Sequence, residues 1–494
     1  MQLSRYTLKN ISSRKVIVPN EEAFELPEKV LQFGTGKLLR GLPDYFIDKA
    51  NRKGIFNGRI VIIKSTSKGD ATAFEKQNGL YTLCVRGIVE GEKIEQNIIS
   101  SSVSRVLIAQ TDWAEILACA HNQNLKVIIS NTTEVGIQLV NEDIHGRPPV
   151  SFPGKLLAFL YERFIAFDGS HDSGLVIVPT ELISDNGKKL ESVVMQLADL
   201  NFLEDEFIEW LKKCNFFCNS LVDRIVTGTP DDKIKNEIEN ELGYKDDLMI
   251  VSEVYSLWAI EGDEKVRSIL SFVEADEGVE VKPNINLYRE LKLRLLNGTH
   301  TLSCGVALLA GFDTVLDAME DPTFFRFIKS LMVEELAPCI PYEIDEELKQ
   351  DFISKVIDRF RNPYINHLWR DITLNYSSKM LLRCIPLLVN YYRNHDTAPK
   401  MFALGFASYA YFMKVKNRNG KEFYSELMGK SYVVEDEMAE RFHKLRSCIL
   451  IECIVENVLK EESFWRYNLS ILPGFQESII ENLNNIITEG IQIN

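Results

Sequence analysis

The order of apolar and polar positions divides the chain into two regions of different character. Up to about residue 285, short apolar runs of strand length alternate with stretches of helical spacing, which is the pattern of α/β folds. Beyond that point strand-like runs are rare, and amphipathic segments with helical spacing continue to the C-terminus. A chain of 494 residues is also too long for one ordinary core. We therefore predict an α/β domain over residues 1–285 and an all-helical domain over residues 286–494.

The first clear strand leads directly into a glycine turn. Residues 30–33 form an apolar run that ends at Phe33, and Gly34-Thr35-Gly36 follow before an amphipathic segment that contains Arg40. A strand, a glycine turn and a helix in this order let a backbone approach a pyrophosphate, so a Rossmann-like dinucleotide-binding domain is predicted. Leu39 stands where the G-x-G-x-x-G pattern has its third glycine, so an ordinary strand–helix turn remains the alternative.

Further polar residues follow other strands of the predicted sheet. The strand at 59–63 ends in Lys64-Ser65-Thr66, and the nearest acid that could bind ribose hydroxyls is Asp70, which leaves the choice between NAD and NADP open. The strand at 125–130 is followed by Thr133 and Glu134, at the strand end where open α/β sheets place ligands. We expect these three residues to line the cofactor site together with Phe33, Gly34, Thr35, Gly36 and Arg40.

The start of the helical region holds the second candidate site. Lys292, Asn297 and His300 lie within nine residues, with leucines between them. In an α-helix, at about 100° per residue, His300 would lie roughly 80° and Asn297 roughly 140° from Lys292, so all three would fit on one broad face. A desolvated base beside two hydrogen-bond donors is suited to removing a proton from an alcohol. The alternative is a structural helix with a snorkelling lysine and a core histidine.

Composition narrows the possible partners. The net charge of −15 argues against nucleic acid or an anionic membrane as the main partner, although a site can be locally basic on an acidic chain. The apolar runs are too short to span a bilayer, and the N-terminus lacks the layout of a signal peptide. Nine scattered cysteines without a Cys-x-x-Cys or His-Glu-x-x-His pattern predict no structural metal and a cytoplasmic location. The oligomeric state stays open.

Several segments, in the same order, resemble the mannitol dehydrogenase family of polyol-specific long-chain dehydrogenases. The matching segments are Gly34-Thr35-Gly36 with Arg40, Gly79-Leu80-Tyr81-Thr82, Thr133-Glu134-x-Gly136, Val222-Asp223-Arg224-Ile225, Lys292-x4-Asn297-x2-His300 and Ser378-Lys379. They extend from about residue 30 to residue 390, so the resemblance covers most of the chain. It implies NAD-dependent hydride transfer, without a metal, between a nicotinamide and a small hydroxylated substrate.

The resemblance also implies roles for individual residues. Lys292 would act as the acid/base, while Asn297 and His300 would donate hydrogen bonds to the substrate oxygen. Asp223 and Lys379 would hold substrate hydroxyls or a carboxylate. To these we add Arg383, one helical turn beyond Lys379, as a second cation for a carboxylate. An exposed helical arginine is the alternative for this residue.

Within the family, the closer likeness is to a branch that reduces a keto-hexuronate to an aldonate in hexuronate catabolism. The segments Leu31-Gln32-Phe33-Gly34, Glu181-Leu182-Ile183 and Leu293–Thr301 carry this likeness. Leu182 stands where the polyol enzymes have an asparagine, and Asp371, next to Arg370, stands where they have an arginine. Both differences argue against a polyol substrate and are compatible with a uronate. The alternatives are another uronate reductase, a mannitol-type polyol dehydrogenase, or a non-catalytic sugar-acid sensor.

Overall fold

The computed structural model describes residues 1–65, 71–132, 136–445, 448 and 450–493, and these form two compact units. Unit 1 comprises Met1–Gly87 and Lys93–Ile285, and unit 2 comprises Ile88–Glu92 and Asn286–Asn494. The change of pattern near residue 285 thus lies at the division between the units. Residues 88–92 join unit 2 although they are distant from its other residues in sequence.

The core of unit 1 is a sheet of six parallel strands. They are β2 (Glu28–Phe33), β3 (Arg59–Lys64), β6 (Val103–Ile108), β7 (Val127–Ser130), β8 (Val176–Pro179) and β9 (Phe216–Phe217). Their spatial order is β6-β3-β2-β7-β8-β9, which is the 3-2-1-4-5-6 order of the Rossmann fold. The Rossmann prediction is therefore confirmed, and the chain changes direction along the sheet between β2 and β7.

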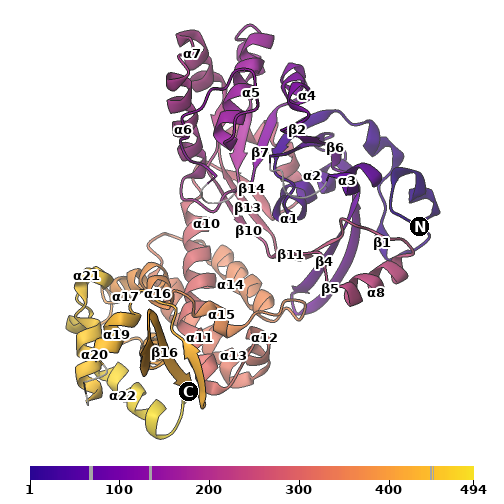
Figure 1. Cartoon of the computed structure of the whole chain (residues 1–494). Helices are drawn as coiled ribbons and strands as arrows, with labels where there is room; N and C mark the ends of the chain where they lie inside the picture. Colours follow the sequence, from indigo (N-terminus) through magenta and orange to yellow (C-terminus); the bar gives the residue numbers. More distant parts are fainter. Residues whose placement is uncertain (66–70, 133–135, 446–447, 449, 494) are drawn as a thin grey trace. The chain divides into compact units, whose positions relative to one another are not determined.

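Both faces of this sheet are buried, because successive side chains of a strand point to opposite sides. Val30, Ile62 and Ile129 belong to one hydrophobic cluster, whereas Leu31 and Ile128 belong to another. Helices cover the second face (Figure 1), namely α4 (Trp113–Ala118), α5 (Phe152–Ala166), α6 (Asn186–Leu200) and α7 (Asp205–Cys214). This explains why these strands are almost uniformly apolar and could be recognised in the sequence.

Unit 1 contains two smaller sheets. A five-stranded sheet has the order β1 (Val16–Ile17), β5 (Glu92–Ser100), β4 (Tyr81–Val89), β12 (Ile250–Glu253) and β11 (Val226–Gly228). A three-stranded sheet has the order β10 (Ser220–Asp223), β13 (Leu257–Glu261) and β14 (Val279–Lys282). The charged stretch 231–247 contains α8 (Asp232–Leu242), whose first turn is capped by the Asp231 carboxylate.

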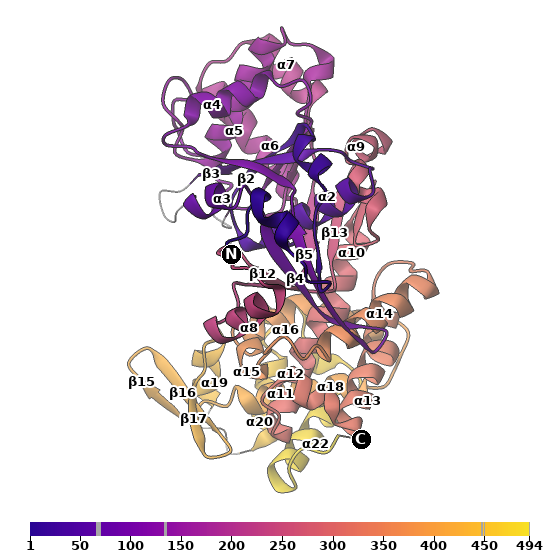
Figure 2. The same cartoon turned by 90° about the vertical axis from the view of Figure 1, so that its right-hand side faces the viewer.

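Unit 2 is built around two buried helices that cross closely (Figure 2), α11 (Thr299–Ala310) and α18 (Lys400–Phe412). Glycines make the close approach possible. A Cβ atom at Gly405 would lie 2.7 Å from the Leu302 carbonyl oxygen, and one at Gly305 would lie 3.0 Å from Ser408 Cβ. The crossing fixes α11, which begins immediately before His300.

Unit 2 is mostly helical, as predicted, but it also contains a small antiparallel sheet that the prediction of an all-helical domain missed. Its strands are β15 (Asn417–Asn419), β16 (Glu422–Leu427) and β17 (Lys430–Val433). These strands are largely exposed, so they lack the apolar alternation that marks a half-buried strand. Met428 and Gly429 join β16 to β17, and both have positive φ, as a two-residue hairpin turn requires.

Among the residues that the structure describes, no helix has both the length and the apolar character needed to cross a bilayer.

Candidate active site

The glycine turn of unit 1 follows β2, at the point where the strand order reverses. Gly34 has φ +126°, and a Cβ atom there would lie 2.9 Å from Leu39 Cδ1 and 3.1 Å from the Asn131 carbonyl oxygen. A Cβ atom at Gly36, in contrast, would meet no atom within 4 Å. Gly34 is therefore required by the fold, whereas the backbone at Gly36 is open to an approaching ligand. This cradle fits a dinucleotide phosphate.

Two other residues predicted for this site have buried side chains. Phe33 is fully buried, with its ring 5.0 Å from that of Phe152. Arg40, in α1 (Lys37–Gly41), donates from Nη1 to the Leu248 carbonyl oxygen at 2.6 Å, and its guanidinium lies over the Tyr81 ring. Both side chains thus make contacts in the interior of unit 1, next to the turn in sequence. A direct contact of either with a cofactor stays a prediction.

The neighbouring strand end, after β7, is held by one buried carboxylate. Glu181 Oε1 accepts hydrogen bonds from the Thr132 amide and hydroxyl at 2.8 and 3.0 Å, and Oε2 accepts from Ser130 Oγ at 3.2 Å. Glu181 therefore fixes the path of the chain as it leaves β7. Asp70, Thr133 and Glu134, which the sequence predicted for the cofactor site, lie outside the described residues.

In unit 2, the stretch Lys292–Gly298 is a π-helix, η6, where the sequence predicted an α-helix. In a π-helix the backbone bonds join residues five apart, so residues five apart approach the same face. Lys292 and Asn297 are five apart and come onto a common face more closely than the predicted 140° implied. Such π-helical turns are frequent at functional sites.

A buried arginine holds η6 against its neighbour. Arg294 forms an ion pair with Glu290 at 2.9 Å, and its Nη1 donates to the carbonyl oxygens of Leu382 and Arg383 at 2.6 and 2.9 Å. These carbonyls end α16 (Tyr376–Arg383), where an α-helix has no internal donors left and attracts a cation. Arg294 therefore ties the helix of Lys292 to the helix of Lys379.

His300 is enclosed by aromatic rings. Its imidazole stacks on Phe360 with the ring centroids 4.1 Å apart and an angle of 11°, and it meets His367 and Trp369 edge to face. Burial, reinforced by the positive charges around it, lowers the pKa of His300 well below its ordinary value, so the ring is neutral at pH 7. Within the described residues, its Nε2 atom has no hydrogen-bond partner. A neutral ring with one nitrogen available can bond a substrate oxygen.

Three cations surround this neutral ring and contribute to lowering its pKa, namely Arg359, Lys379 and Arg383. Lys379 Nζ donates to the Ile372 carbonyl oxygen at 2.9 Å, and Arg383 Nη1 donates to Thr301 Oγ1 at 3.2 Å. Burial lowers the pKa of both Lys379 and Arg383. The sequence analysis missed Arg359, in α14 (Glu346–Phe360), because no spacing links it to Lys292. The sequence showed only that Arg359 lies in the last turn of an amphipathic helix.

Asp223, predicted to hold the substrate, belongs to unit 1. It ends β10, where it pairs with Leu257 of β13, and it is 8% exposed. Its neighbour Arg224 donates to the carbonyl oxygens of Glu253 and Gly41 at 2.9 and 2.7 Å, so that side chain has a structural role. A substrate role for Asp223 stays a prediction.

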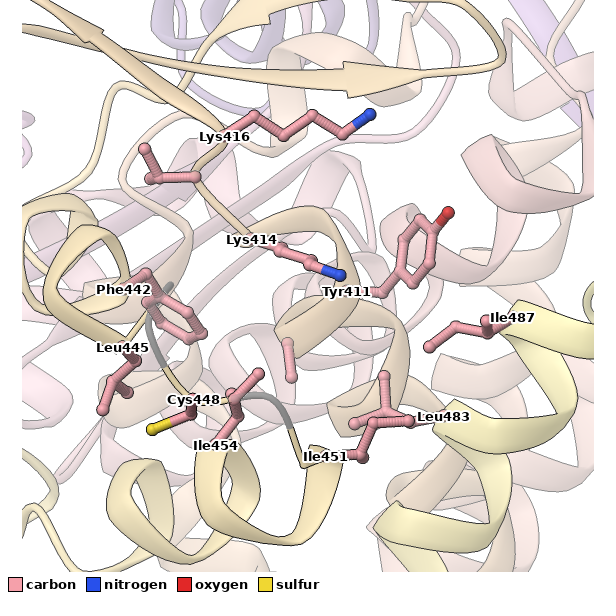
Figure 3. A pocket seen from close by; sticks show the side chains of 12 residues that line it. Tyr411, Lys414, Lys416, Phe442, Leu445, Cys448, Ile451, Ile454, Leu483 and Ile487 are labelled. Atoms are coloured by element: carbon pink, nitrogen blue, oxygen red, sulfur yellow. The ribbon is translucent and has the colours of Figure 1, made fainter.

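A separate cavity of about 510 Å³ lies elsewhere in unit 2 (Figure 3). Its wall is mainly apolar, with Phe442, Ile454 and Leu483 among the lining side chains. Lys414 and Lys416 extend along one side, and Lys416 is ion-paired with Glu426 at 2.8 Å. Among the described residues of this wall, none belongs to the set predicted for catalysis.

Two family models match the chain over most of its length. The mannitol dehydrogenase Rossmann domain matches residues 28–271, and the mannitol dehydrogenase C-terminal domain matches residues 284–487. The chain is 37% identical to the altronate oxidoreductase of Bacillus subtilis (strain 168) over 469 residues, covering 95% of this chain and 94% of the relative. It is 35% identical to the altronate oxidoreductase of Halalkalibacterium halodurans over 492 residues, covering 98% and 95%.

Solved structures share the fold at lower sequence identity. A D-sorbitol dehydrogenase in substrate-free form superposes with a TM-score of 0.80 at 19% identity, covering 99% of both chains. The mannitol 2-dehydrogenase of Pseudomonas fluorescens, in a ternary complex with NAD and D-mannitol, superposes with a TM-score of 0.66 at 20% identity, covering 99% of this chain and 97% of that one.

The environment of His300 predicts a specific pH dependence of stability. Because the pKa of His300 is lowered on folding, the unfolded chain binds more protons below its ordinary pKa of 6.5, and stability falls as the pH falls through that value. His300→Gln should reduce the drop in the unfolding midpoint between about pH 7.5 and about pH 5.5 by on the order of 3 °C. Thermal unfolding monitored by circular dichroism measures it. The exposed His145→Gln serves as control, and equal behaviour of the two variants would contradict the prediction.

Proposed function

Because the chain belongs to the mannitol dehydrogenase family, we propose that it catalyses the NAD-dependent reduction of tagaturonate to altronate. It is an oxidoreductase acting on a CH–OH group, of the kind that converts polyols or sugar acids. The finer assignment, of cofactor and substrate, is supported by the glycine turn of unit 1 and by the residues around His300 in unit 2. Full-length similarity to altronate oxidoreductases supports it as well.

The cofactor assignment is supported by the glycine turn of unit 1. Gly34 allows the tight turn after β2, and the backbone at Gly36 is open to a phosphate. Both lie at the reversal of strand order, where Rossmann domains bind dinucleotides. Gly34, Thr35 and Gly36 would hold the pyrophosphate. A bound nicotinamide would supply the hydride that reduces the substrate carbonyl carbon.

The observation that carries the substrate assignment is the group of cations around His300. Lys379 and Arg383 both act on its imidazole, and both are half-buried, in a chain whose net charge is −15. Concentrating half-buried positive charge in one place on an acidic protein costs desolvation and repulsion. A bound carboxylate would offset both costs, whereas a neutral polyol would offset neither. A uronate is therefore the substrate class that this region favours.

Side chains of η6 and α11 would transfer the proton to and from the substrate oxygen. During ketone reduction, the Lys292 ammonium would transfer its proton to the substrate oxygen as the carbonyl carbon accepts the hydride. Asn297 and the neutral His300 would donate hydrogen bonds to that oxygen while negative charge builds up on it. In the reverse direction, the neutral Lys292 amine would remove the hydroxyl proton. Lys379 and Arg383 would orient the carboxylate and thereby the carbonyl.

A substrate panel tests the proposal. NADH oxidation is measured with tagaturonate, fructuronate and fructose side by side, and with NADPH in place of NADH. We expect the highest kcat/KM with tagaturonate and NADH. A preference for fructuronate or for fructose would replace the substrate assignment by one of the alternatives. Cofactor or substrate binding without turnover would favour a sensor.

Replacing Lys292 separates chemistry from binding. Because the general acid would be lost, Lys292→Ala should lower kcat by about 10²–10⁴-fold while NADH affinity stays within about twofold of the wild type. Steady-state kinetics and the quenching or enhancement of NADH fluorescence measure the two quantities. An equal loss of NADH binding would contradict the catalytic role of Lys292.

Replacing Arg383 tests carboxylate recognition. Loss of a charge-assisted hydrogen bond predicts that Arg383→Ala lowers kcat/KM for tagaturonate by about 10–100-fold, with a smaller effect on any activity towards a polyol. Arg326→Ala, in the exposed part of α13 (Pro322–Ser330), is the control and should leave both activities unchanged. An unchanged preference between uronate and polyol in Arg383→Ala would refute the role.

A further inference from the structure

The end of α16 packs against one face of η6 and α11. Arg294 donates to the Arg383 carbonyl oxygen at 2.9 Å. The Gly298 carbonyl oxygen accepts from Cys384 Sγ at 3.6 Å, and Thr301 Oγ1 accepts from Arg383 Nη1 at 3.2 Å. Spacings of four and three residues place Arg294, Gly298 and Thr301 on the same face. Arg383 is thus held twice, at its backbone by Arg294 and at its guanidinium by Thr301.

The Thr301 hydroxyl has a fixed direction. Thr301 is fully buried, and its Oγ1 donates its one hydrogen to the Asn297 carbonyl oxygen, four residues earlier, at 2.8 Å. Only lone pairs remain on Oγ1, and these suit the Arg383 guanidinium because that group can only donate. Arg383 therefore donates to Thr301, and Thr301 donates to the backbone of Asn297. Each of these hydrogen bonds polarises the other and strengthens it.

This contact orients Arg383 without neutralising it. Thr301 is an uncharged acceptor, in contrast to Glu290, which forms an ion pair with Arg294. Burial lowers the pKa of Arg383, and among the described residues only two cysteine thiols, and no carboxylate, act against this shift. Arg383 is half-buried, and its charge contributes to lowering the pKa of His300. Its positive charge is therefore oriented, close to the proposed reaction site, and available to an anion.

We propose that Thr301 is a positioning residue for substrate recognition, whose hydroxyl holds the Arg383 guanidinium in the orientation that binds the substrate carboxylate. The inference rests on the proposed function, because it takes Arg383 as a cation that binds a uronate. A long arginine side chain otherwise samples many rotamers, and ordering it on binding lowers the affinity for the substrate. The hydrogen bonds through Thr301 order it before the substrate arrives. They also fix its position relative to Asn297, the residue that would bond the substrate oxygen.

Two replacements of Thr301 test the hydroxyl. Thr301→Val removes it while keeping a side chain of nearly the same shape, so the Arg383 guanidinium loses its acceptor and the KM for tagaturonate should rise by about five- to tenfold. Because the carboxylate is bound equally in the ground state and the transition state, kcat should stay within about threefold of the wild type. Thr301→Ser keeps the hydroxyl, and its KM should stay within about twofold of the wild type. Steady-state kinetics at saturating NADH measure both constants.

A second threonine of α11 provides a matched control. Thr299 is also fully buried, but within the described residues its Oγ1 atom has no hydrogen-bond partner. Thr299→Val therefore makes the same change of side chain without breaking a contact to Arg383, and it should leave the KM for tagaturonate unchanged. A rise in KM as large as that of Thr301→Val would mean that losing any hydroxyl from this helix has the same effect, which overturns the proposal.

A double-mutant cycle shows whether Thr301 acts through Arg383. In the Arg383→Ala background, Thr301→Val should change KM by less than about twofold, because the group that Thr301 positions is gone. Effects on KM that multiply would overturn the proposal. A purely structural role would reduce the amount of folded enzyme, so it would lower the unfolding midpoint and the apparent kcat while leaving KM unchanged. That result would overturn the proposal as well.

The choice of substrate separates failure of this inference from failure of the proposed function. If the wild type reduces tagaturonate and Thr301→Val has the same KM, the inference alone is wrong. If the wild type prefers fructuronate, the proposed substrate is wrong, and the same KM comparison with fructuronate decides the role of Thr301, because fructuronate also carries a carboxylate. Turnover of fructose alone would refute both, since there would be no carboxylate for Arg383 to bind.

Discussion

The candidate active site of unit 2 depends on the contact between Arg294 and the end of α16. That single guanidinium, neutralised by Glu290, satisfies the last carbonyl oxygens of the helix that carries Lys379 and Arg383. The same residue lies within the π-helix of Lys292 and Asn297. Two helices whose bonded residues are more than eighty positions apart in sequence are thereby held in one arrangement. Because both hydrogen bonds are charge-assisted, each is stronger than a hydrogen bond between neutral groups.

The electrostatics of this region follow from burial rather than from net charge. Arg359, Lys379 and Arg383 are half-buried, whereas His300 is enclosed by rings and stays neutral. Positive neighbours make protonation of the imidazole still less favourable. A neutral imidazole among cations can serve the substrate oxygen without adding to the repulsion. Under the proposed function, the cations would bind the carboxylate and the neutral imidazole would bond the oxygen, so the two tasks would fall to different side chains.

Sequence patterns predicted those features whose signal is local. The strand that ends at Phe33 and the Lys292, Asn297 and His300 spacing were both visible because burial or chemistry imposes a short-range pattern. The π-helix was not predictable, since its leucines suit an α-helix equally well. Arg359 was missed because only tertiary packing brings it to His300. The exposed hairpin of β15–β17 was missed because its strands bury too few side chains to show alternation.

The two units use burial of a titratable group in opposite ways. In unit 2, burial keeps the base His300 free of a proton, and this state is lost on the acid side of its range. In unit 1, burial keeps the acid Asp44 protonated, and this state is lost on the alkaline side. Each group is therefore neutral in the same intermediate range of pH, and within the described residues neither His300 Nε2 nor the Asp44 carboxyl oxygens have a hydrogen-bond partner. Desolvation thus sets the charge state of both groups, each in the hydrophobic core of its own unit.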